Sequence, residues 1–304
     1  MLGRLAELAV CQKALAAAGE DDAAAVVISG APGIGKTTLW RAVAGSPEPG
    51  VMVLRTTGVP GWQPSWANLA DLLDPAAETV LSGLAGPQAS ALRTALGWAA
   101  ADAPVGEAVL ERAVVTVLRG LAEAGVMVAI DDEQWVDQDT RRLLEAAVVR
   151  LGDAPVRWLV SVRAHNSGQG LARVLEHELG PRAARVELAA LDDAALSELV
   201  MSRFPGGWSP GVLRHVVALA AGSPYAALEV ARETAARGGR DGAGAQLPST
   251  LSGSLRSRLT GLGPRTLAVV QVAALAGTPT RVLLGTVAGS PAGVFLPRNV
   301  VVGR

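Results

Sequence analysis

Short apolar runs alternate with helical repeats along the first 190 residues. The runs have the length of buried strands, and Gly, Pro or acidic residues bound several of them. The predicted strands are residues 24–29, 51–57, 126–130, 156–162 and 184–188. Continuous apolar runs are typical of parallel strands that are covered on both faces, and strands that alternate with helices favour βαβ connections. The pattern therefore predicts an α/β fold with a parallel, doubly wound sheet.

The segments between these strands are predicted to be helical. Residues 36–44 form a helix after a glycine-rich loop, a helical insertion broken by prolines extends to Trp98, and residues 105–123 repeat apolar positions at helical spacing. Further helices are expected at 140–151 and 171–179. These elements are assigned to one domain, residues 1–190.

The pattern changes to helices alone after this domain. Residues 191–237 are predicted to form a small all-α domain with helices at 192–203, 210–221 and 224–237. A glycine-rich linker, 238–247, follows by composition, and two more helices are expected before residue 276. Residues 277–304 are rich in Gly and Pro, and their pattern fits either a hairpin or disorder.

Composition excludes several classes of protein. A hydrophobic fraction of 50% with 18% charged residues is unlike a disordered chain. A net charge of −1 gives no long-range attraction to nucleic acid, whose binding domains usually carry a basic face. Residues 2–18 are interrupted by Arg4, Glu7 and Lys13, and no uncharged apolar run reaches the roughly 18 residues of a membrane span. Cys11 and the three histidines lack metal-ligand spacing. We expect a cytoplasmic protein without a membrane segment.

A phosphate-binding motif links the first strand to the first of these helices. The segment fits G-x-x-x-x-G-K-[ST] at every fixed position, with an apolar strand before it and a helix after it. Glycines let backbone N–H groups face phosphate oxygens, a Lys bridges the β- and γ-phosphates, and a Thr hydroxyl ligates Mg²⁺. The predicted nucleotide-binding residues here are Gly30, Ala31, Pro32, Gly33, Ile34, Gly35, Lys36, Thr37 and Thr38. The motif predicts a P-loop NTPase that binds ATP and Mg²⁺, with Thr37 as one metal ligand.

Charged residues follow two other predicted strands. Asp131 ends the apolar run 126–130, and the carboxyl ends of parallel strands share one edge of a sheet, so its carboxylate is predicted to hold Mg²⁺ beside the phosphate loop. Either Asp132 or Glu133 could orient the attacking water, and spacing does not choose between them. Arg163, after the run 156–162, could contact the γ-phosphate, although spacing alone fits a surface Arg equally well.

Together these segments resemble the nucleotide-binding region of the large LuxR-type transcriptional regulators, STAND-class ATPases related to AAA+ proteins. The resemblance runs from Gly3 to about Ala276. It rests on the G-R-x-x-E-L box at residues 3–8, the phosphate loop, the insertion helix at 68–73, the I-D-D-E-Q-W-V-D segment at 130–137 and the G-S-P-Y turn at 222–225.

The resemblance implies roles that spacing does not provide. Gly3 and Arg4 would lie near the adenine, Arg163 would be the sensor arginine, and Pro224 would contact the nucleotide from a helical lid. The two consecutive aspartates differ from the Asp-Glu pair of fast ATPases, which implies slow hydrolysis. Ser223 replaces the usual Asn of the turn.

The resemblance also implies what lies around this region. Residues 248–304 would form part of a winged-helix domain, and the chain stops where that domain should be forming, so it is expected to be either a fragment or a stand-alone module. Expected partners are ATP or ADP, together with a second copy or other domains of a larger regulator. The alternatives are a stand-alone ATPase or small-molecule kinase, and a degenerate nucleotide-binding module kept for protein interaction.

Overall fold

The computed structural model describes residues 2–16, 24–61, 63–99, 106–164, 168, 170–236, 267 and 270. The predicted linker, 238–247, lies outside this part of the chain, and so does the predicted winged-helix segment, 248–304, except for residues 267 and 270. None of the helices in the described part is both long and apolar enough to cross a bilayer.

Five parallel strands form the predicted sheet. They are β1 (Ala24–Gly30), β2 (Met52–Thr57), β3 (Val126–Asp131), β4 (Val156–Arg163) and β5 (Ala183–Leu188). Their order across the sheet is β2-β3-β4-β1-β5, so β4 lies between the strand that precedes the phosphate loop and the strand that precedes the acidic pair. In the register, Gly30 lies beside Arg163, and Ile130 lies beside Val160. The doubly wound α/β prediction is confirmed, and the carboxyl ends of β1, β3 and β4 meet at one edge.

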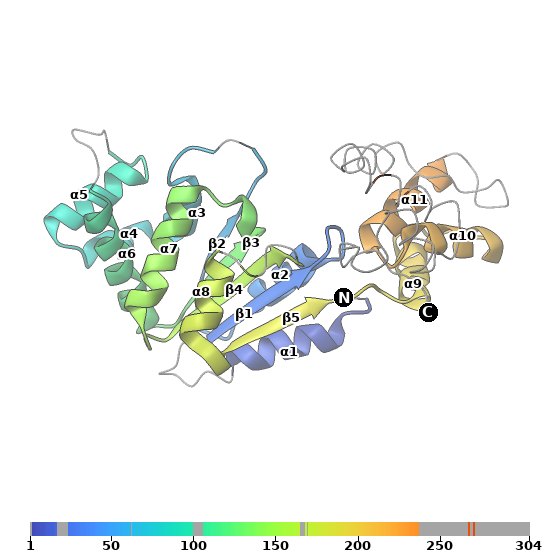
Figure 1. Cartoon of the computed structure of the whole chain (residues 1–304), viewed down its shortest axis with the longest axis horizontal. Coiled ribbons are helices and arrows are strands. Elements are labelled where there is room, and N and C mark those ends of the chain that lie inside the picture. Colours follow the sequence, from blue (N-terminus) through green and yellow to red (C-terminus); the bar gives the residue numbers. More distant parts are fainter. Residues whose placement is uncertain are drawn as a thin grey trace, which may run out of the picture.

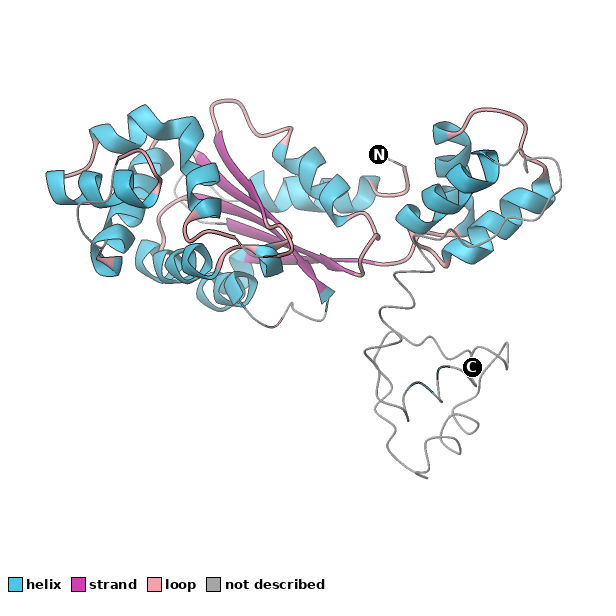
Figure 2. Ribbon diagram, turned by 90° about the horizontal axis from the view of Figure 1, so that it is seen from above, coloured by secondary structure: helices cyan, strands magenta, loops and turns pink. Residues whose placement is uncertain are grey.

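Helices cover both faces of the sheet (Figures 1 and 2). On one face lie α1 (Leu5–Ala16) and α2 (Lys36–Ala44), and on the other lie α3 (Ala67–Leu73), α6 (Glu107–Ala122), α7 (Gln138–Leu151) and α8 (Gly170–Leu179). The short helices α4 (Ala77–Ser82) and α5 (Gly86–Ala95) pack on α6. An apolar core lies on each face of the sheet, and side chains of β1 alternate between them. Val27 lies in one core and Val26 and Ile28 in the other, which explains why apolar residues on β1 are continuous.

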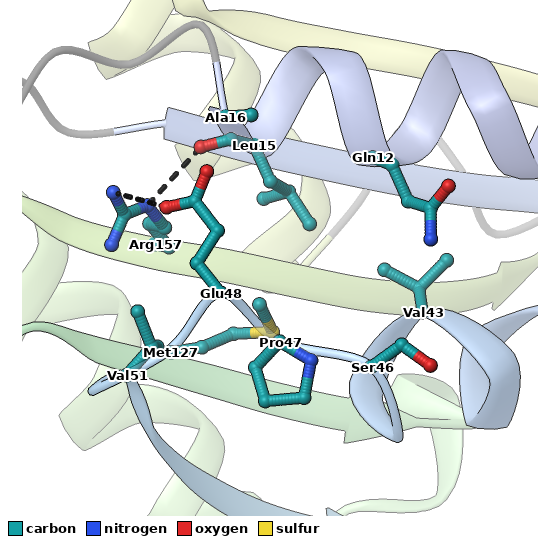
Figure 3. A pocket seen from close by; sticks show the side chains of 10 residues that line it. All are labelled: Gln12, Leu15, Ala16, Val43, Ser46, Pro47, Glu48, Val51, Met127 and Arg157. Carbon is teal, nitrogen blue, oxygen red and sulfur yellow. Dashed lines mark hydrogen bonds and ion pairs between the residues drawn. The ribbon is translucent and has the colours of Figure 1, made fainter.

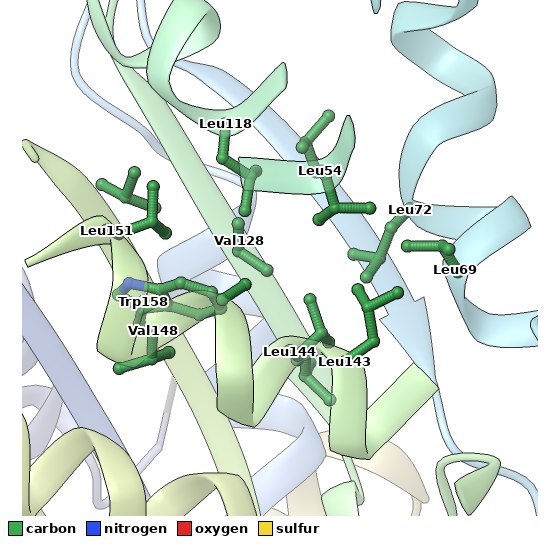
Figure 4. Packing of buried hydrophobic residues seen from close by; sticks show 14 of the residues in the cluster. Leu54, Leu69, Leu72, Leu118, Val128, Leu143, Leu144, Val148, Leu151 and Trp158 are labelled. Atoms are coloured by element: carbon green, nitrogen blue, oxygen red, sulfur yellow. The ribbon is translucent and has the colours of Figure 1, made fainter. Parts of the chain in front are cut away.

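The larger core lies between the sheet and α3, α6 and α7. Trp158 on β4 is 2% exposed and packs with Val148 and Leu151 of α7, and Leu54 on β2 faces Leu72 of α3 (Figure 4). Burial of each such side chain contributes about 1.5–3 kcal/mol. This core holds the carboxyl ends of β3 and β4 in a fixed register.

Helix α1 was not predicted, because its sequence is apolar on nearly all sides and shows no clear helical face. Cys11 and Leu15 are buried against β1, β5 and α2, whereas Leu5 and Val10 remain exposed. Burial, aided by the charge of Glu7, raises the pKa of the Cys11 thiol to about 11, which makes it an inert packing residue.

Three helices form a separate cluster after β5: α9 (Asp193–Arg203), α10 (Pro210–Ala220) and α11 (Pro224–Ala236). We call this cluster the lid. It has its own apolar core, which includes Leu196, Val216 and Val230. Residues 189–192 connect β5 to the lid, which lies beyond the carboxyl ends of β1 and β5 (Figure 1). Asp192 and Ser209 cap α9 and α10 through the backbone N–H groups three residues on.

Candidate functional site

The phosphate loop curls between β1 and α2 as its glycines require. Gly33 and Gly35 have positive φ values of 75° and 104°, which side-chain-bearing residues rarely adopt. A Cβ on Gly30 would lie 2.9 Å from Ile34 Cγ2, whereas a Cβ on Gly35 would meet no atom within 4 Å. The loop is therefore tight at its base and open at Gly35, where α2 begins.

Lys36 is buried at the centre of this loop. Its side chain is one of the few charged groups in the core, with 6% exposure, and Nζ donates to the carbonyls of Gly30 and Ala31 at 3.1 and 3.0 Å. Burial lowers the pKa of Lys36, and the nearby carboxylates of Asp132 and Asp131 oppose this shift. The ammonium is thus held at the loop, close to two negative charges.

A cavity of about 350 Å³ opens above the loop. This volume is within the usual range for small-molecule sites. The cavity brings together the phosphate loop, the carboxyl ends of β3 and β4, and the first turns of α11. Its lining residues are Pro32, Gly33, Gly35, Lys36, Thr37, Thr38, Asp132, Arg163, Pro224, Tyr225 and Leu228.

The residues at this cavity fit a nucleoside triphosphate with Mg²⁺. Lys36 and Arg163 supply positive charge, the start of α2 supplies backbone N–H groups, and the open space at Gly35 leaves room for a phosphate chain. Thr37 supplies a hydroxyl, and two carboxylates lie at this edge of the sheet: Asp132 lines the cavity, and Asp131 precedes it at the end of β3. Mg²⁺ usually takes only one or two protein carboxylates and completes its shell with phosphate oxygens and water, so this donor set is sufficient.

The two aspartates after β3 occupy different positions. Asp131 is 1% exposed, and its carboxylate accepts a hydrogen bond from Ser161 Oγ on β4. Asp132 has a φ of 53°, and its backbone N–H donates to the same Ser161 Oγ at 2.9 Å. Asp132 lines the cavity, whereas Asp131 lies in the interior and acts on the charge of Lys36. Ser161 links the two, and no motif in the sequence marks this residue.

Arg163 is held by two residues of the short 3-10 helix η2 (Glu133–Trp135). Its guanidinium lies over the Trp135 ring, 5.1 Å from the centroid, and its backbone N–H donates to Gln134 Oε1 at 3.1 Å. Gln134 Nε2 donates in turn to Asp132 Oδ1 at 2.7 Å. The predicted sensor arginine and the predicted water-orienting aspartate are therefore joined through one side chain.

Glu133 does not face the cavity, which corrects its assignment as a candidate acid. It is 3% exposed, and its carboxylate accepts hydrogen bonds from the backbone N–H groups of Leu171 and Ala172 at 2.6 and 3.3 Å. Burial raises the pKa of Glu133 to about 7, although these two bonds oppose the shift. A Cβ on Gly170 would collide with this carboxylate. Glu133 anchors the start of α8, and Asp132 is left as the candidate at the cavity.

Gly3 and Arg4, predicted to lie near the adenine, are not among the residues that line the cavity. Arg4 is 6% exposed and pairs with Glu7 at 2.7 Å, and it donates to the carbonyls of Ala189 and Ile34 at 2.5 and 3.4 Å. A Cβ on Gly3 would lie 2.9 Å from Leu191 Cδ2. In this structure both residues join the amino terminus to the phosphate loop and to the lid connection.

The first turn of α11 contacts the phosphate loop directly. The Tyr225 N–H and Ser223 Oγ both donate to the Gly33 carbonyl, at 3.2 and 3.3 Å. Gly222 has a φ of 80°, and its carbonyl accepts from the Leu191 N–H at 3.0 Å. Pro224 lies between these contacts and lines the cavity. The lid therefore completes the wall of the site.

The insertion supports the turn that carries Asp132. The Asp137 carboxylate accepts from the backbone N–H groups of Trp66, Asn68 and Thr140 at 2.9–3.1 Å. A Cβ on Gly58, just after β2, would lie 2.5 Å from the Asp132 carbonyl oxygen. The insertion and the residues after β3 are therefore packed as one unit.

A second cavity, of about 190 Å³, lies at the opposite end of the strands (Figure 3). Val43 and Met127 line it together with the Arg157–Glu48 ion pair. Arg157 also donates through Nε to the Leu15 carbonyl at 3.1 Å. Its charged lining residues, Arg157 and Glu48, form an ion pair with each other, whereas Lys36, Arg163 and Asp132 converge on the first cavity.

Comparisons with known proteins agree with this geometry. A family profile described as an AAA ATPase domain matches residues 1–162, more than half of the chain. The search of curated proteins gave no match.

Two solved structures, an ATPase and Cdc6p, show a similar fold. A Walker-type ATPase of Pyrococcus abyssi is 16% identical, with a TM-score of 0.60 over 98% of this chain and 87% of that one. Cdc6p from Pyrobaculum aerophilum is 14% identical, with a TM-score of 0.51 over 96% of this chain and 82% of that one. A STAND protein with a tetratricopeptide repeat sensor from Pyrococcus horikoshii is 14% identical, with a TM-score of 0.48 over 90% of this chain and 34% of that one. From the profile match, the chain belongs to the AAA ATPase domain family.

Proposed function

We propose that this chain is an ATP-binding, slowly hydrolysing switch module of a LuxR-type transcriptional regulator. The observation that carries the proposal is the shared cavity, because the phosphate loop, Asp132, Arg163 and the start of α11 line one space. A ligand in that space would contact the sheet domain and the lid together. The box at residues 3–8, the trailing Trp135 and Asp137, and the turn at 222–225 support the LuxR-type assignment.

Each residue has a role in this proposal. Lys36 binds the β- and γ-phosphates as a point charge, and Thr37 and Asp131 would hold Mg²⁺, which would offset the negative charge of these phosphates. Asp132 orients the water that attacks the γ-phosphorus, and Arg163 stabilises the charge on the transferred phosphoryl group. The reaction cleaves the bond between the γ-phosphorus and the bridging oxygen and releases ADP and phosphate.

The lid makes the site a switch. Arg163 from the sheet domain and Pro224 from the lid line the same cavity, so ATP and ADP can stabilise lid positions to different extents. Only a difference in affinity between the open and closed states moves such an equilibrium. The boundaries of the sheet domain (1–190) and the lid (191–237), and control by other domains or a second copy, are part of this proposal. Direct DNA binding by this chain is not.

An equilibrium titration with ATP and Mg²⁺ tests the proposal. Lys36→Ala should weaken binding by at least about tenfold, since it removes the charge at the phosphates. Lys13→Ala is the matched control, because Lys13 is an exposed lysine on α1. Equal affinity of the wild type and Lys36→Ala for ATP would refute the nucleotide site.

Turnover separates the alternatives. A switch should release phosphate slowly, whereas many turnovers per second would favour a stand-alone ATPase, and ATP-dependent phosphorylation of a small molecule would favour a kinase. Tight ATP binding with no phosphate release would instead favour a degenerate interaction module.

A further inference from the structure

Gln134 uses both ends of its amide at the site. Its Oε1 accepts from the backbone N–H of Arg163 at 3.1 Å, and its Nε2 donates to Asp132 Oδ1 at 2.7 Å. An N–H group can only donate, so the bond from Arg163 fixes which end of the amide is the oxygen. The NH₂ group must then face Asp132. Gln134 itself is not among the residues that line the cavity.

The two residues that Gln134 joins come from different strands. Asp132 follows β3, and Arg163 ends β4. Both line the cavity, and both act on the charge of Lys36. Ser161 of β4 also bonds to Asp131 and Asp132. Its bond to Asp132 involves only the backbone N–H and does not restrain the Asp132 carboxylate. Gln134 is the side chain that orients the carboxylate.

The local fold does not depend on Gln134. The turn is closed by backbone bonds from Trp135 N–H to the Asp132 carbonyl at 2.9 Å and from Val136 N–H to the Glu133 carbonyl at 3.0 Å. Arg163 is held in addition by the Trp135 ring. Loss of the Gln134 side chain should therefore leave the turn in place and release only the Asp132 carboxylate and one bond to Arg163.

We infer that Gln134 is a positioning residue that couples the candidate water-orienting group to the candidate sensor. Through it, the carboxylate of Asp132 and the backbone of Arg163 are set as one unit, so that phosphate contact at Arg163 and water orientation at Asp132 occur together. This inference rests on the proposed function, since it assigns Gln134 a part in hydrolysis at the same site.

Three variants test this inference. Gln134→Ala removes both bonds, and Gln134→Glu keeps an acceptor for Arg163 but places a second carboxylate against Asp132. Gln63→Ala is the matched control, because Gln63 donates to the carbonyl of Trp135, next to Gln134, and to that of Val59 after β2, and not to Asp132 or Arg163. Steady-state phosphate release from ATP and Mg²⁺ and the equilibrium affinities for ATP and ADP are measured for each.

Gln134→Ala should lower kcat by at least about tenfold, because a misplaced catalytic group loses most of its effect, while KM and the affinity for ADP change less than about threefold. Gln134→Glu should also lower kcat, because it replaces the NH₂ donor to Asp132 with a carboxylate that repels it, while it keeps the acceptor for the Arg163 N–H. Gln63→Ala should behave as the wild type does. A merely structural role would lower the affinities together with kcat.

The failures of the two proposals differ. An unchanged kcat in Gln134→Ala overturns the inference and leaves the nucleotide switch intact. A parallel loss of nucleotide affinity and kcat in Gln134→Ala also overturns the inference, because it shows a general effect on the fold. An equal loss of kcat in Gln63→Ala overturns it for the same reason. A wild type that binds ATP but releases no phosphate also overturns it. Equal ATP affinity in the wild type and Lys36→Ala would refute the nucleotide site itself.

Discussion

Replacement of Glu133 by Gln should change how the stability of the protein depends on pH. Burial raises the pKa of Glu133 from 4.5 to about 7 in the folded protein. Between these values the folded state keeps a proton that the unfolded state has lost, so the stabilisation present below pH 4.5 disappears as the pH rises through 7. The difference corresponds to about 3 kcal/mol in the free energy of unfolding.

Urea unfolding of the wild type and Glu133→Gln between pH 4.5 and 8 measures this effect. A Gln side chain does not titrate, so its variant should lack this component while all other groups titrate alike in both proteins. The wild-type free energy of unfolding, minus that of the variant, should fall by about 3 kcal/mol across the range. A constant difference would refute the assignment of Glu133 as a buried carboxyl at the start of α8.

Three further substitutions test the support of the site. Gly58→Ala should lower the free energy of unfolding by about 1–3 kcal/mol and slow ATP turnover, because the added Cβ would displace the Asp132 carbonyl. Thermal unfolding and phosphate release measure these effects, and a fully active variant would contradict the prediction. Asp137→Ala should lower the free energy of unfolding, measured in urea, by about 2–4 kcal/mol, because three backbone N–H groups lose the carboxylate that accepts their hydrogen bonds. Ser223→Ala should weaken the lid contact at Gly33 by about 1 kcal/mol, visible as faster proteolysis near the lid connection; unchanged cleavage would argue against a stabilising contact.

The sheet could be predicted because its strands and helices are encoded locally. The runs of β1, β3 and β4 are buried on both faces, so continuous hydrophobicity located these strands within a residue or two. The phosphate loop at residues 30–37 was also predictable, because the glycines and Lys36 that define its motif lie within eight consecutive residues. The family profile supports the ATPase assignment that followed from them.

The contacts between distant segments could not be predicted. Glu133 follows two aspartates and was an equally good candidate acid, but its side chain turns toward α8, a segment about 40 residues further along the chain. Gln134 and Ser161 carry no recognisable motif, and their roles depend on the neighbouring positions of β3 and β4. Helix α1 was missed because a helix with apolar residues on most sides gives no periodic signal.

The short connection between β5 and the lid sets how far the lid can travel. Residues 189–192 can span at most about 18 Å when extended, so a lid that leaves the phosphate loop remains tethered beside it. Such a tether keeps the effective concentration of the lid in the millimolar range or above. The two hydrogen bonds to Gly33 would be too weak to join separate molecules, but the tether lets them form within one chain. In the proposed switch, a contact of this strength would respond to a modest change at the nucleotide, such as the loss of one phosphate.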